Sequence, residues 1–65
     1  MAQVFVKSGH SDTVEVDVME RDGRLYAEAA DVSVSGLLKA MRNEYPAKSF
    51  VGYKPARGCA AVFEE

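Results

Sequence analysis

A run of alternating valines places the strongest constraint on how this chain can fold. Val14, Val16 and Val18 are separated by single acidic residues. Successive side chains of a strand point to opposite faces of a sheet, so this pattern places the valines on a core and the acids in water. Residues 13–20 are therefore predicted to form a strand with one buried face.

Turn signals on both sides of this strand predict that it pairs with a strand before it and a strand after it, in a three-stranded unit. Asp22-Gly23 follows it, and a type I′ turn needs positive φ at two central residues, which Asp tolerates and Gly adopts readily. A third strand is predicted over 24–29. Residues 2–8 also alternate, and the turn residues of 9–12 predict a hairpin with the valine strand.

The spacing of apolar residues changes from strand to helix after the third strand. Ser33 is a candidate N-cap, and Pro46 is predicted to end the helix because the residue before a proline avoids the α region. The apolar residues that share one helical face are Val34, Leu37, Leu38, Met41 and Tyr45. A helix that covers one face of the sheet follows from this stripe.

Two further strands are predicted over 48–54 and 59–64, joined by a turn at Pro55–Gly58. Phe50 and Gly52 then share one face of their strand. The chain is expected to be a single α+β domain, residues 1–65, in the order βββαββ. Its antiparallel sheet should carry one helix packed on one face.

The usual means of stabilising a small fold are missing from the composition. A chain of 65 residues buries only about 60% of the surface that its unfolded form exposes. The single cysteine cannot form an internal disulfide, and no Cys/His cluster suggests a metal, so no cofactor is expected. A partner or a second copy would supply the missing stabilisation. No apolar run approaches the ~18 residues of a membrane span, and a cytoplasmic protein is expected.

No residues are arranged as a catalytic group. His10 lies in a predicted turn, where exposed histidines without a role are common. Cys59 begins a predicted strand, and although Arg57 is close in sequence, a separation of two residues on a strand-like path does not indicate an activated thiol, so a small half-buried residue is expected there. An enzyme is therefore the least expected class, since no nucleophile is paired with a base.

Charge is divided unevenly along the chain. Residues 1–31 carry seven acids and three bases, a net charge of −4, whereas residues 32–65 carry five bases and three acids, a net charge of +2. The whole chain has a net charge of −2. Such asymmetry bears on the kind of partner that a protein attracts.

The leading functional hypothesis is a non-enzymatic module that binds protein through an acidic face. An acidic domain of this size suits a small inhibitor of the kind that phages and mobile elements encode. It would dock on a larger host protein, steered toward a nucleic-acid-binding surface. The residues assigned to this face are Glu15, Asp17, Glu20, Tyr26 and Glu28.

Two alternatives remain open from the sequence. Basic residues interleaved with aromatic ones are typical of single-strand nucleic-acid surfaces, although the sequence pI of about 5.3 argues against this class. The residues assigned to this alternative are Lys39, Arg42, Lys48, Tyr53, Lys54 and Arg57. The other alternative is a structural homodimer that pairs exposed strand edges.

Overall fold

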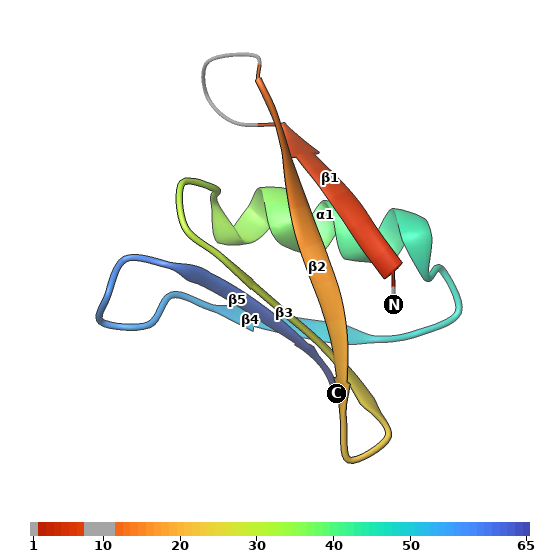
Figure 1. Cartoon of the computed structure of the whole chain (residues 1–65). Coiled ribbons are helices and arrows are strands. Elements are labelled where there is room, and N and C mark those ends of the chain that lie inside the picture. Colours follow the sequence, from red (N-terminus) through yellow and green to blue (C-terminus); the bar gives the residue numbers. More distant parts are fainter. Residues whose placement is uncertain (1, 8–11) are drawn as a thin grey trace.

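The computed structural model describes residues 2–7 and 12–65 and has the predicted element order (Figure 1). Most of the predicted turn at 9–12, including His10, lies outside the described residues. The elements are β1 (Ala2–Lys7), β2 (Thr13–Arg21), β3 (Arg24–Ala29), α1 (Val34–Glu44), β4 (Phe50–Tyr53) and β5 (Ala60–Glu64). Among the described residues, no helix is long and apolar enough to span a membrane.

All five strands form one antiparallel sheet in the order β1-β2-β3-β5-β4. The strand β5 lies between β3 and β4, so β1 and β4 are the edges. The strand predicted over 48–54 is shorter than expected and begins at Phe50. Its start is delayed because the Lys48 amide donates to the Tyr45 carbonyl, at 3.1 Å, in the turn that follows the helix.

Both turn predictions that depend on positive φ are confirmed. Asp22 has a φ of 54° and Gly23 a φ of 77°, as a type I′ turn requires. Gly58 has a φ of 81°, and its amide donates to the Pro55 carbonyl at 3.0 Å. These turns hold β2 against β3 and β4 against β5. Asp31 also has a positive φ, 64°, which the sequence pattern did not predict.

The ends of α1 also follow the predicted signals. The Ser33 side chain caps the helix by accepting from the Gly36 amide at 3.0 Å. At the other end, the Tyr45 amide donates to the Met41 carbonyl and Pro46 follows. The helix therefore has the length that the apolar stripe predicts.

The core lies between α1 and one face of the sheet (Figure 1). Leu37 and Met41 are fully buried on the helix and face inward-pointing strand residues. On this one face, the helix contacts β1 at one edge of the sheet, and β4 and β5 toward the other edge. The buried strand residues of this cluster are Val4, Val6, Val16, Val18, Ala27, Phe50, Ala60 and Val62.

Gly52 allows α1 to approach β4 closely. A Cβ built at this position would lie 2.7 Å from Val34 Cγ1 and 3.1 Å from Leu38 Cγ. Contacts of that length are too short for packed carbon atoms, so a side chain there would push the helix away from the sheet. The missing side chain at Gly52 therefore sets the distance between the two layers.

We predict that Gly52→Ala lowers the free energy of unfolding by about 1 to 3 kcal/mol, because the added methyl group overpacks the contact with Val34. Chemical denaturation of Gly52→Ala, Val34→Ala and the double variant measures this effect. The double variant should lose less stability than the sum of the two single changes. Additive losses would show that the two positions do not compete for space.

Candidate binding face

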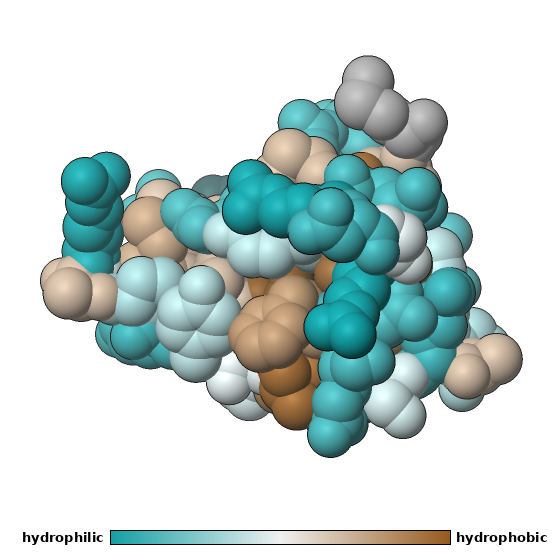
Figure 2. Space-filling model, turned by 90° about the horizontal axis from the view of Figure 1, so that it is seen from below, coloured by the Kyte–Doolittle hydropathy of each residue, from teal (hydrophilic) through white to brown (hydrophobic). Residues whose placement is uncertain are grey.

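The face of the sheet opposite α1, here called the open face, is covered by no element of residues 2–7 and 12–65. Four large apolar or aromatic side chains are exposed on this face, at 60% for Phe5, 46% for Met19, 47% for Tyr53 and 36% for Phe63. Viewed from below, Figure 2 shows apolar side chains gathered near the middle of the molecule with hydrophilic ones around them. The open face thus has an apolar centre and a polar surround.

Strand register aligns two of these side chains, Met19 and Phe63, with Tyr26 and Val51 in one line across the sheet. Met19 pairs with Tyr26, Tyr26 with Phe63, and Phe63 with Val51. We call these four residues the apolar row. Tyr26 and Val51 are half-buried and the other two are exposed, so the row forms a continuous surface over β2, β3, β5 and β4.

Tyr53 extends the apolar row along β4. Its ring meets that of Phe63 edge to face, with centroids 5.7 Å apart and an interplanar angle of 70°. Ala61 lies on the same face, between Glu28 and Tyr53 in the register, and is completely buried although no helix covers it. The larger side chains around this small residue close over it, which gives the face a packed surface.

Tyr26 is held by two charged neighbours. Its hydroxyl donates to Glu28 Oε2, and the Arg21 guanidinium lies over its ring, 5.5 Å from the centroid. The hydrogen bond to Glu28, helped by burial, raises the pKa of Tyr26 to about 12, because ionisation would place two negative charges together. These two neighbours together fix the orientation of the ring.

We predict that Glu28→Gln moves the pKa of Tyr26 back toward its ordinary value of 10.0. Absorbance of the phenolate during an alkaline titration measures the shift, and Tyr26→Phe identifies the phase that belongs to Tyr26. Because folding raises the pKa of Tyr26, the protonated hydroxyl stabilises the folded state. This stabilisation is complete below about pH 10 and is lost as the pH rises through about 12. A late phase that persists in Tyr26→Phe would contradict the assignment.

The structure places most of the predicted acidic residues on one face but separates one of them. Glu15, Asp17 and Glu28 lie on the open face, and Asp17 Oδ1 accepts from the Gln3 side-chain amide at 3.0 Å. Glu20 pairs with Leu25 and has the same parity along β2 as the buried Val18, so it points to the side of the helix. Because alternate residues of a strand point to opposite faces, the spacing along β2 alone places Glu20 on the other face from Glu15 and Asp17.

The predicted basic residues are dispersed over the surface. Lys39 and Arg42 are exposed on α1, on the other side of the sheet from Tyr53. Lys54 and Arg57 lie in the exposed β4–β5 connection. These residues are neighbours in sequence but do not share one face.

Lys48 belongs to a local ion pair with the last strand. Its Nζ lies 3.4 Å from Glu64 Oε2, the one salt bridge within residues 2–7 and 12–65. Glu64 Oε1 also accepts from the Leu25 amide at 3.1 Å. That backbone hydrogen bond, with the nearby Lys48, holds the pKa of Glu64 below its usual value.

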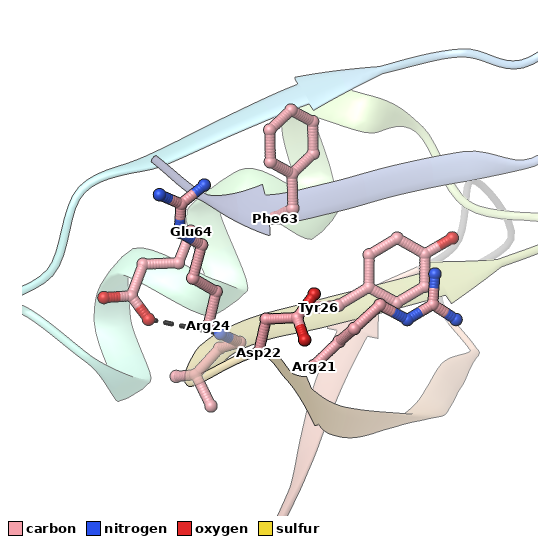
Figure 3. Close-up of a pocket in the computed structure, with 7 residues that line it drawn as sticks. Arg21, Asp22, Arg24, Tyr26, Phe63 and Glu64 are labelled. Carbon is pink, nitrogen blue, oxygen red and sulfur yellow. Dashed lines mark hydrogen bonds between the residues drawn. The ribbon is translucent and has the colours of Figure 1, made fainter.

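A shallow hollow of about 440 Å³ lies where the apolar row meets the β2–β3 turn (Figure 3). In this view Arg21 lies against Tyr26, and the Arg24 side chain extends on the other side of Phe63. Arg21 and Arg24 are directly opposite each other in the register, although like charges at such positions repel. Sequence reasoning missed the apolar row, because the strand that brings Phe63 beside Tyr26 comes from the other end of the chain. It also missed the arginine pair, although the predicted Asp22-Gly23 turn already places Arg21 opposite Arg24.

The described residues contain no group of three or more His, Cys, Asp or Glu side chains that could hold a metal ion. Cys59 is half-buried just before β5, in agreement with the expected small residue at this position. Comparisons with protein-family models, with curated proteins and with solved structures give no match to this chain. The open face is therefore interpreted from its own geometry.

Proposed function

We propose that this chain is a non-enzymatic protein-binding module that docks a larger, basic protein on its open face. The observation that carries the proposal is the apolar row, exposed at the centre of a face with acids beside it. Protein interfaces have an apolar, aromatic-rich centre and a polar rim, and tyrosine and arginine contribute much of their binding energy.

The acids at one end of the open face support a basic partner. Glu15 and Asp17 project from β2 on the open face, and Glu28 projects from β3. Complementary charge at the rim raises the rate of association and selects the partner, while the apolar centre supplies affinity. A basic nucleic-acid-binding surface of a host protein has the required charge, as the sequence-based inhibitor hypothesis supposes.

Binding of nucleic acid gains no comparable support. Tyr53 is exposed on the open face, but the nearby Glu28 carboxylate would repel phosphates, and Lys39 lies on the helix side. A single-strand surface needs bases that follow the same path as the aromatic rings. The basic-segment hypothesis therefore stays a prediction from sequence alone.

We predict that Glu15→Lys/Asp17→Lys abolishes capture of the protein partner, because the reversed charges would repel a basic surface. The full chain is immobilised, proteins that it captures are identified by mass spectrometry, and the affinity of the purified partner is then measured. Binding of the same partner to the wild-type chain should weaken as the salt concentration is raised, because salt screens the attraction between the acids and a basic surface.

Glu20→Lys is the matched control for this experiment. It reverses a charge of the same kind on the same strand but on the helix side of the sheet, so capture should persist. A second variant, Phe63→Ser, tests the apolar row and should also weaken binding. Capture that is equal for the wild type, the double reversal and Phe63→Ser would overturn the proposal.

A further inference from the structure

We propose that the open face also binds a second copy of this chain, with the two apolar rows in contact and the strands reversed across a two-fold axis. This inference concerns the same face as the proposed function, but it rests on a different observation. That observation is the alternation of charge around the apolar row.

Charge changes sign from corner to corner of the open face. On β2 and β3, Arg21 and Arg24 lie two residues beyond the apolar row in one direction. Asp17 and Glu28 lie two residues beyond it in the other direction. Residues two apart on a strand are about 7 Å apart, so a positive pair and a negative pair flank the row at equal distance.

The β5 and β4 side of the face carries the opposite pattern. Glu65 follows Phe63 by two residues and lies at the arginine end, where its amide donates to the Ser49 carbonyl at 3.0 Å. Lys54 and Arg57 follow β4 at the acid end. All three are exposed. Lys54 alternates with the open-face Tyr53 and so lies off this face. Glu65 and the basic β4–β5 connection nevertheless have the opposite sign to the β2 and β3 charges at the same end of the sheet.

A two-fold axis along the apolar row makes this pattern complementary to itself. Rotation about such an axis places the apolar row of one copy on the apolar row of the other, and the strands of the two copies then run in opposite directions. Arg21 and Arg24 of one copy then face Asp17 and Glu28 of the other, and the contact occurs twice, as in every isologous interface. An axis along the strands would place two arginines over the single Glu65, so the row axis matches charge better.

The charged groups of this face form no salt bridge with described residues of the same copy, although Arg24 lies near enough to Glu64 to help lower the pKa of that carboxyl. Arg21 and Arg24 are paired across the strands with no salt bridge to another described residue, and Asp22 in the adjoining turn forms none either. Asp17 and Glu28 accept hydrogen bonds from neutral Gln3 and Tyr26. Opposite charges from a second copy would relieve both repulsions, which the fold alone leaves in place.

An interface of ordinary size would use a modest share of the surface of this chain. A standard interface buries roughly 800 Å² on each partner, which is about a sixth of the 4574 Å² surface of this chain. A small domain without a disulfide gains most from such burial, because its own core is limited. A larger partner and a second copy use overlapping residues, so each excludes the other.

The test uses the purified full chain and two charge-reversal variants, with molar mass measured by light scattering from about 5 to about 500 µM. The variants are Arg21→Glu/Arg24→Glu and Asp17→Arg/Glu28→Arg. The wild type should approach twice 7.1 kDa. Each variant alone should raise the dimer Kd by about 100-fold or more, because like charges then face each other twice.

Mixing the two variants should restore the dimer at near wild-type affinity, since both corner contacts become complementary again. Restoration shows that neither variant lost association through unfolding. The matched control pair is Lys39→Glu/Arg42→Glu with Glu20→Arg/Glu44→Arg, which makes the same changes in net charge away from the open face. Each control variant should dimerise alone as the wild type does.

Three results would overturn the inference: a wild type that stays at 7.1 kDa throughout, reversal variants that dimerise as well as the wild type, or a mixture that stays monomeric. Dimers that survive both reversals would instead indicate pairing of the strand edges. Because the test contains no other protein, its failure leaves the proposed binding of a larger partner untouched.

Discussion

The packing of one helix on one face of the sheet is the contact on which the rest of this structure depends. Leu37 and Met41 fill the space between the helix and the sheet. Gly52 has no side chain, so the helix can approach the sheet closely enough for these two residues to be buried. A single helix can cover only one face of a five-stranded sheet. The exposed aromatic residues on the other face are therefore a direct consequence of how the core is made.

Local patterns were sufficient to predict the elements and their order. The valine alternation, the Asp22-Gly23 turn and the apolar stripe after Ser33 each depend on neighbours in sequence, and each is confirmed. The shorter β4 strand was not foreseen, because the hydrogen bond from Lys48 to Tyr45 forms only once the helix has ended. Sequence patterns predict an element well where interactions between residues close together in the sequence determine it.

The candidate site was predicted less completely, because it depends on which strands become neighbours. Glu15, Asp17 and Glu28 were placed together through alternation and one tight turn. The apolar row needs Phe63 beside Tyr26, a pairing across 37 positions that no local signal specifies. The acidic composition of β2 predicts one acidic face, but Glu20 has the same parity as the buried Val18 and lies on the helix side.

The central place of β5 has a consequence for biosynthesis. Four strands and the helix are synthesised before the strand that joins β3 to β4. Until β5 inserts, the aromatic surface is split into two unconnected parts, and the inner edges of β3 and β4 have no partners. The continuous open face therefore exists only once β5 has paired with both β3 and β4.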